Sequence, residues 1–148
     1  MNTMAADEKK TANVLWFKDL RIEDVPLVGG KNAALGEMYA NLTPLGVNVP
    51  NGFALTATAY RFFFKRTGLE STIKKILRDL DTGSIKNLQT RGKAVRKAIL
   101  DVNLPDELKE EVADAYKELE QMYGKNVERT PRVISSSGMA FPVNPACH

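Results

Sequence analysis

Two adjacent glycines followed by a lysine, at the start of an amphipathic helical pattern, constrain this chain more than any other feature. They lie in the stretch Val25 to Leu42, which reads VPLVGGKNAALGEMYANL. Glycine reaches backbone conformations that a Cβ atom forbids, and it lets a ligand approach the main chain closely. The first turn of a helix offers unpaired N–H groups and the positive end of the helix dipole. Gly29 and Gly30, with the ammonium group of Lys31 beside them, therefore have the parts needed to hold a phosphate.

The same residues also allow a plainer interpretation, in which the glycines form a loop that only starts a helix. Their spacing is not that of a P-loop, G-x-x-x-x-G-K-[ST], and it is not the G-x-G-x-x-G of dinucleotide-binding folds. On spacing alone, the sequence favours a loop that only starts a helix, and phosphate binding is the more specific alternative.

Length and composition are those of an ordinary globular protein. The chain has 148 residues, of which 43% are hydrophobic and 26% charged, so it can form one domain with a sizeable core. The net charge of +3 argues only weakly for nucleic acid or an anionic membrane. Lys65 to Lys97 is rich in basic residues and Asp101 to Glu120 is mostly acidic. Because both blocks fall on helical patterns, we interpret them as solvated faces, and a nucleic-acid patch is the lesser interpretation.

Neither the cysteine content nor the apolar runs indicate an exported or membrane protein. Cys147 is the only cysteine, and no apolar run has the length of a membrane span. Residues 1–13 are polar and have no apolar segment behind them, which predicts a flexible leader and not a signal peptide. We therefore expect a cytoplasmic protein. Cys147 and His148 have no further Cys or His to complete a metal site, so none is expected there.

Short strands and amphipathic helices are predicted along the chain. β-Branched and aromatic residues predict strands at Val14–Leu20 and Phe53–Leu55. The prolines and glycines of TPLGVNVPNG exclude a helix and predict a loop. Five helices are expected, and the residues that should share the inward face of each are Ala34, Leu35, Met38 and Leu42; Tyr60, Phe63 and Phe64; Ile73, Ile76, Leu77 and Leu80; Ile85, Leu88, Val95, Ile99 and Val102; and Leu108, Val112, Ala115, Leu119 and Met122.

Residues suited to helix ends support these assignments. Thr56 or Thr58 can cap the second helix, and Ser84 can cap the fourth. Pro105, followed by acidic residues, is a favourable opening for the fifth helix, and Gly124 is well placed to end it.

The expected fold is a helix-rich α+β unit with a small sheet. The sheet would comprise Val14–Leu20, the Phe53 region and a third candidate strand at Arg132–Ser135, with about five helices covering it. The final segment, SSSGMAFPVNPACH, has no periodicity and contains prolines, so irregular structure is expected there. The sequence shows no carboxylate cluster of the kind that holds magnesium.

Two paired motifs carry a resemblance to a known family. VGGKNAALGEM, followed by GVNVPNGFALTATAYRFF, resembles the opening of the nucleotide-binding domain of phosphoenolpyruvate synthase (pyruvate, water dikinase), a family that includes pyruvate phosphate dikinase. The resemblance runs from about Val14 to Gly68, with a looser helical continuation to about Gly124. It implies the N-terminal portion of an ATP-grasp fold, with ATP as the ligand and Mg²⁺ as a cofactor of the family. It also implies that Lys31, the lysine after the paired glycines, contacts the nucleotide phosphates.

The resemblance weakens beyond about residue 130. The family has an arginine directly before paired serines, whereas this chain reads PRVISSSG, so Arg132 is not in register. The acidic loop of the family is replaced by Met139–Pro142. The second ATP-grasp half with its magnesium ligands, the phosphohistidine domain and the pyruvate-binding barrel have no counterpart, and His148 matches nothing in the phosphohistidine motif. The sequence therefore predicts an N-terminal fragment, with a leader at 1–13, a partial ATP-binding domain at 14–130 and a divergent tail at 131–148.

Two classes of function are expected from these features. The first is an ATP-binding piece of a phosphotransferase that converts ATP, pyruvate and water to AMP, phosphoenolpyruvate and phosphate through a phosphorylated histidine. Such a piece would bind phosphate or nucleotide weakly by itself, would contain no catalytic residue, and could pair with a separately encoded remainder of the enzyme. The second class is a non-enzymatic module that docks on a partner protein through its basic helices.

Overall fold

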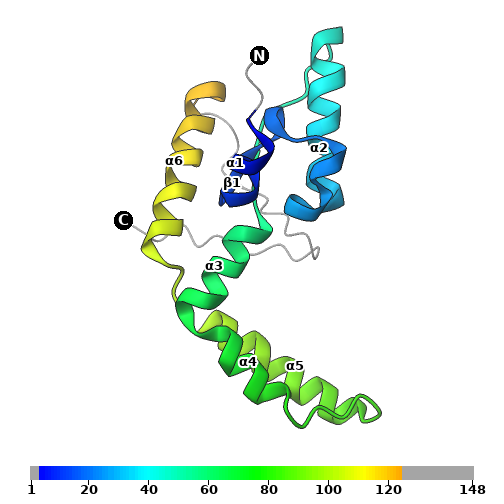
Figure 1. Ribbon diagram of the computed structural model, residues 1–148, viewed down its shortest axis with the longest axis vertical. Helices are drawn as coiled ribbons and strands as arrows, with labels where there is room; N and C mark the ends of the chain where they lie inside the picture. The colour runs from blue at the N-terminus through cyan, green and yellow to red at the C-terminus, as the bar shows by residue number, and fades with distance from the viewer. Residues whose placement is uncertain (1–3, 125–148) are drawn as a thin grey trace. The chain divides into compact units, whose positions relative to one another are not determined.

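The computed structural model describes residues 4–124 of the chain, and Figure 1 shows their helices and strands. The chain divides into a first unit, Met1–Ala59 with Glu110–His148, and a second unit, Tyr60–Lys109. The elements in chain order are α1 (Ala6–Thr11), β1 (Val14–Trp16), η1 (Phe17–Asp19), η2 (Ile22–Asp24), α2 (Val25–Leu42), η3 (Thr43–Leu45), β2 (Phe53–Leu55), α3 (Ala57–Thr67), α4 (Leu69–Leu77), α5 (Ile85–Leu100) and α6 (Asp106–Tyr123).

The first unit contains a small antiparallel sheet formed by the two strands that the sequence predicts. β1 and β2 pair with Leu15 opposite Ala54, and both of these residues are buried. β1 ends at Trp16, earlier than predicted, because the chain turns into the 3-10 helix η1. The expected helix-rich α+β fold with a small sheet is thus confirmed. The third candidate strand, Arg132–Ser135, lies outside the described residues.

Helix α2 packs closely against the chain that follows β1. A Cβ atom at Gly36 would lie 2.4 Å from the Cβ atom of Leu20, so only glycine allows this approach. Leu20 and Ala33 are fully buried there. The predicted inward face of this helix is wrong, since two of its four residues are exposed and the other two are half-buried. The buried residues of α2 are Val28, Asn32, Ala33 and Gly36.

The described part of the expected leader contains helix α1. Its Lys9 is only 7% exposed and forms an ion pair with Asp24, at 2.7 Å between Nζ and Oδ2. This arrangement differs from the flexible leader that the polar composition suggests, because an ion pair 15 residues apart along the chain leaves no local sequence pattern. The domain boundaries at 13 and 130 remain predictions.

Helix α3 begins at the cap that the sequence proposes. Thr56 Oγ1 accepts the N–H of Ala59 at 3.1 Å and donates to the carbonyl of Ala12 at 2.7 Å. This arrangement identifies Thr56, and not Thr58, as the N-cap residue.

The second unit contains the antiparallel pair α4 and α5, which lie side by side in Figure 1. The cap predicted for α5 is confirmed, since Ser84 Oγ accepts the N–H of Asn87 at 3.3 Å. The predicted burial along α5 is wrong. No residue of this helix is buried, and the side chains of Ile85 and Leu88 are 73% and 48% exposed.

Candidate functional site

Gly29 interrupts helix α2 at the position where the sequence places the paired glycines. Its dihedral angles, φ 79° and ψ 159°, lie in a region that is essentially restricted to glycine. Helix α2 therefore comprises a short segment at 25–28 and a longer one that begins again at residue 30. Gly29 thus uses the backbone freedom that the sequence attributes to the paired glycines.

Gly30 and Lys31 form the exposed start of the longer segment. A Cβ atom at Gly30 would meet no heavy atom within 4 Å, so the main chain can be approached closely there. Lys31 is exposed, and its side chain makes no hydrogen bond or ion pair with any group of residues 4–124. The three residues singled out in the sequence thus lie together on one turn, with the ammonium group free to meet a ligand.

Asn32 is a residue of this turn that sequence reasoning missed. Its side chain is buried, and its Nδ2 group donates to the carbonyl of Val28 at 2.9 Å. The bond joins the residue before Gly29 to the first turn after it. A signal was available, because short amide side chains inside helices tend to bond nearby backbone groups.

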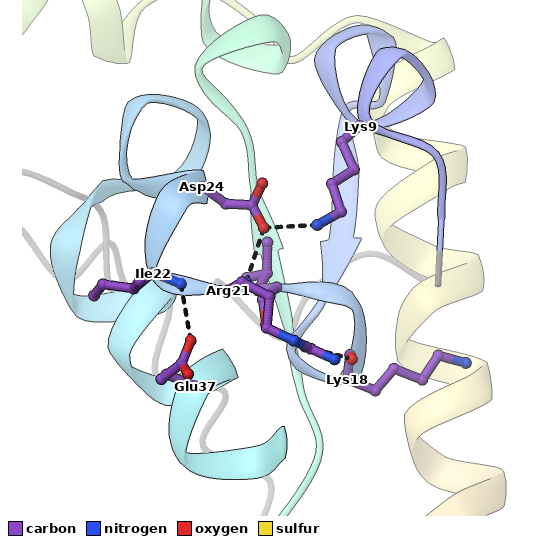
Figure 2. A network of polar contacts seen from close by, with 7 residues as sticks. Lys9, Lys18, Arg21, Ile22, Asp24 and Glu37 are labelled. Carbon is purple, nitrogen blue, oxygen red and sulfur yellow. Dashed lines mark hydrogen bonds and ion pairs between the residues drawn. The ribbon is translucent and has the colours of Figure 1, made fainter. Parts of the chain in front are cut away.

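A polar network holds the chain just before α2, as Figure 2 shows. Asp24 is the last residue before the helix, and its Oδ2 atom accepts from Lys9 Nζ at 2.7 Å and from the N–H of Arg21 at 2.8 Å. The side chains of Lys9 and Asp24 are each 8% exposed. A buried charge pair of this kind depends on both partners, since either charge alone would be costly to bury.

The outer side of the same network ties this segment to the longer part of α2. Glu37 accepts the N–H of Ile22 at 3.0 Å and the side-chain amide of Asn41 at 2.8 Å. The guanidinium group of Arg21 donates to the carbonyl of Lys18 at 3.0 Å and also to that of Leu20. The segment 18–24, which leads into α2, is therefore tied by a hydrogen bond to the longer part of the helix that follows Gly29.

Neither a metal site nor a membrane-spanning helix is found among the described residues. Residues 4–124 contain no group of three or more His, Cys, Asp or Glu side chains placed to hold a metal ion. None of the helices in this part of the chain is long and apolar enough to cross a membrane. Cys147 and His148 lie outside the described residues.

Comparison with known proteins identifies relatives of this chain. Residues 25–141 match the family described as pyruvate phosphate dikinase, AMP/ATP-binding domain. The phosphoenolpyruvate synthase of Synechocystis sp. is 48% identical over 122 residues, which are 82% of this chain and 15% of that protein. The phosphoenolpyruvate synthase of Aquifex aeolicus is 46% identical over 120 residues, or 81% and 14%. That of Escherichia coli is 42% identical over 106 residues, or 72% and 13%.

The chain thus spans about 15% of the length of the curated relatives that it resembles. The family match begins at Val25, the first residue of α2, and includes Gly29, Gly30 and Lys31. Because this match covers most of the chain, the chain belongs to the family of pyruvate phosphate dikinase AMP/ATP-binding domains.

Proposed function

We propose that this chain is part of the ATP-binding region of a phosphoenolpyruvate synthase-like enzyme and binds nucleotide phosphate through Gly29, Gly30 and Lys31. The observation that carries the proposal is the glycine-only conformation of Gly29, which starts a new helical turn beside an exposed and unpaired lysine. The AMP/ATP-binding description of the family supports the choice of ligand.

The chemistry of this turn favours an anion with several oxygen atoms. The N–H groups at the start of a helical segment and the positive end of its dipole attract a phosphate, and the Lys31 ammonium adds a full charge. Exposed charge contacts contribute only about 1 kcal/mol or less in water, and salt weakens them further. The chain alone should therefore bind ATP weakly, discriminate poorly between ATP and GTP, and lose binding as salt is added.

The proposed parent reaction is the conversion of ATP, pyruvate and water to AMP, phosphoenolpyruvate and phosphate in the cytoplasm. The family's Mg²⁺ does not fit a site of its own here, since residues 4–124 lack the required cluster of acidic side chains. The only histidine, His148, does not match the phosphohistidine motif. We therefore expect this chain, incubated alone with ATP, magnesium and pyruvate, to form no AMP above background.

An NMR titration with ATP tests the proposed binding site. The amide signals of residues 28–34 should shift, and Lys31→Ala and added salt should both reduce the shifts. Lys93→Ala is the matched control, because Lys93 is also an exposed helical lysine but lies on α5. Shifts concentrated on residues 86–97, unchanged by Lys31→Ala, would contradict the proposal.

That contrary result would favour a second candidate function, in which α5 docks on an acidic partner protein. Helix α5 carries five basic residues and no acidic one. It also exposes apolar side chains on its surface, including Ile85, Leu88 and Leu100. A helix with both features suits a partner that offers acidic groups around an apolar stripe. The basic residues are Lys86, Arg91, Lys93, Arg96 and Lys97.

A further inference from the structure

Asn32 stands out among the residues of α2 because it is polar and yet only 7% exposed. The other buried residues of this helix are Val28, Ala33 and Gly36, which have no polar side-chain atom. Asparagine is also a weaker helix former than alanine or leucine, by roughly 0.5 kcal/mol. A buried amide at this position therefore needs a hydrogen-bonding role to offset its cost.

The hydrogen bond of Asn32 spans the break in the helix. Its Nδ2 group donates to the carbonyl of Val28 at 2.9 Å, and Gly29 lies between the two residues in the chain. Gly29 turns the backbone away from helical geometry directly after that carbonyl. The Asn32 side chain thus supplies a donor at the point where the helix is interrupted, and it fixes the distance between the two sides of the break.

The two glycines of this turn make a restraint on its conformation important for ligand binding. Gly29 and Gly30 lose more conformational freedom on ordering than any other residues would. A ligand that had to order them would bind more weakly, whereas a turn ordered in advance spares that loss. Within residues 4–124, no heavy atom lies within 4 Å of the Cβ position of Gly30, and the Lys31 side chain makes no hydrogen bond or ion pair that could order the turn instead.

We propose that Asn32 is a positioning residue for the phosphate-binding turn. Through the carbonyl of Val28 it holds Gly29 in its extended conformation with positive φ, so that the main chain at Gly30 and the side chain of Lys31 are set for a phosphate before the ligand arrives. This inference rests on the proposed function, and it assigns to Asn32 no contact with the ligand itself.

The test compares Asn32→Ala with Asn32→Ser, using inorganic tripolyphosphate as the probe. A serine hydroxyl keeps a short side-chain donor near the carbonyl of Val28, and alanine has none. Loss of one hydrogen bond corresponds to an affinity about five- to tenfold weaker for Asn32→Ala, with Asn32→Ser recovering most of it. Both variants are measured well below their unfolding midpoints, so that a loss of stability alone does not change the affinity.

Amide signals of Gly29 and Gly30 without ligand provide a second measurement. They should broaden or shift in Asn32→Ala and return toward wild-type positions in Asn32→Ser. Equal affinity of wild type and Asn32→Ala, or equal weakening in both variants, would overturn the positioning role. If Asn32→Ala does not fold, Asn32→Ser decides alone, since wild-type-like signals and affinity support the role and a loss of both refutes it.

The ligand-free signals also separate this inference from the function on which it rests. If tripolyphosphate fails to bind the wild type, the proposed function is wrong. The Gly29 and Gly30 signals then still decide whether Asn32 holds the turn.

Discussion

The two units of this chain contain very different interiors. The first unit has a core formed by Leu15, Leu20, Val28, Ala33 and Ala54, and it also contains every buried polar or charged residue of the described part. In the second unit, the buried apolar residues are Leu69 and Leu108. The first unit therefore combines apolar burial with buried polar bonds between distant parts of its sequence, and the second does not.

None of the ion pairs of the second unit is buried, and several join residues three or four apart in the chain. Lys74 pairs with Glu70, and Lys97 with Asp101, each four residues apart on one helix. Two arginines reach further along the chain: Arg91 donates to the carbonyl of Ile76 on the neighbouring helix at 2.9 Å, and Arg66 pairs with the exposed Glu107 at 3.5 Å. Segments with few buried contacts open locally at low free energy. The glycine turn lies in the first unit, whose buried apolar and polar contacts make it better suited to hold a fixed geometry.

The largest expected effect tests the buried ion pair of the first unit. Asp24→Ala leaves Lys9 buried without its partner and removes the acceptor of the Arg21 N–H. Breaking a buried pair in this way costs about 3–5 kcal/mol in the free energy of unfolding. Urea unfolding measures the loss. The control is Asp79→Ala in the second unit, whose partner is Arg91 at 3.8 Å and whose side chain is 76% exposed; it should change stability by less than about 1 kcal/mol.

If Asp24→Ala and Asp79→Ala lowered the free energy of unfolding equally, the buried ion pair would not distinguish the first unit from the second. A small cost for Asp24→Ala would show that the Lys9 pair adds little to the first unit, and that α1 is not needed to hold the start of α2.

The next effect compares the two glycines of the candidate site. Gly29→Ala forces a side chain into a conformation reserved for glycine and should destabilise the first unit by about 1–3 kcal/mol. Gly30→Ala should be neutral or slightly stabilising, because its Cβ atom meets nothing within 4 Å. Thermal unfolding of the two variants measures the difference. Similar melting temperatures would mean that residue 29 can leave the positive-φ conformation without cost in stability.

Sequence reasoning located this turn because a glycine requirement can be read from residue type alone. The buried face of α2 could not be predicted from residue type in the same way. Periodicity identifies residues that share a helix face, but the close approach of Gly36 to Leu20 selects a different face from the one with the largest apolar residues. The Lys9–Asp24 pair was also missed, since its partners come from separate elements and neither is apolar.

The error on α5 has another cause. Its apolar residues do recur at helical spacing, and the helix and its Ser84 cap form as predicted. Amphipathic spacing predicts which side chains share a helix face, but it does not predict whether another element covers that face. Ile85 and Leu100 are each 73% exposed. Burial depends on tertiary neighbours, which a single helix pattern does not contain.

A smaller effect is expected at the cap of α5. Ser84→Ala removes the acceptor for the N–H of Asn87 and should cost about 1 kcal/mol. Ser84→Gly should cost only a few tenths of a kcal/mol, because glycine is itself a good N-cap residue. Native-state hydrogen exchange measures the protection of the backbone amides of α5 directly, and the protection of the α2 amides should be unaffected. Equal protection changes in α2 and α5 would show that the two units unfold together and would weaken the comparison.

The smallest effect concerns the exposed carboxylates, which occur in both units. A hydrogen bond from Lys74, followed by its charge, lowers the pKa of Glu70, and Lys10 lowers the pKa of Asp7 in the same way. A carboxyl whose pKa is lower in the folded state stabilises the fold above its unfolded pKa, and this contribution is lost as the pH falls through the folded value. Glu70→Gln and Asp7→Asn should therefore differ from wild type at neutral pH and converge with it as the pH falls through the lowered pKa values of the folded state.

Because both carboxylates are largely exposed, the two substitutions should have similarly small effects, although they lie in different units. Urea unfolding at several pH values measures them. A much larger acid-sensitive loss for Asp7→Asn than for Glu70→Gln would mean that α1 depends on its surface charges as well as on Lys9. Equal and small losses would place the stability difference between the units in their interiors, where the first unit has a buried ion pair and the second has none among the described residues.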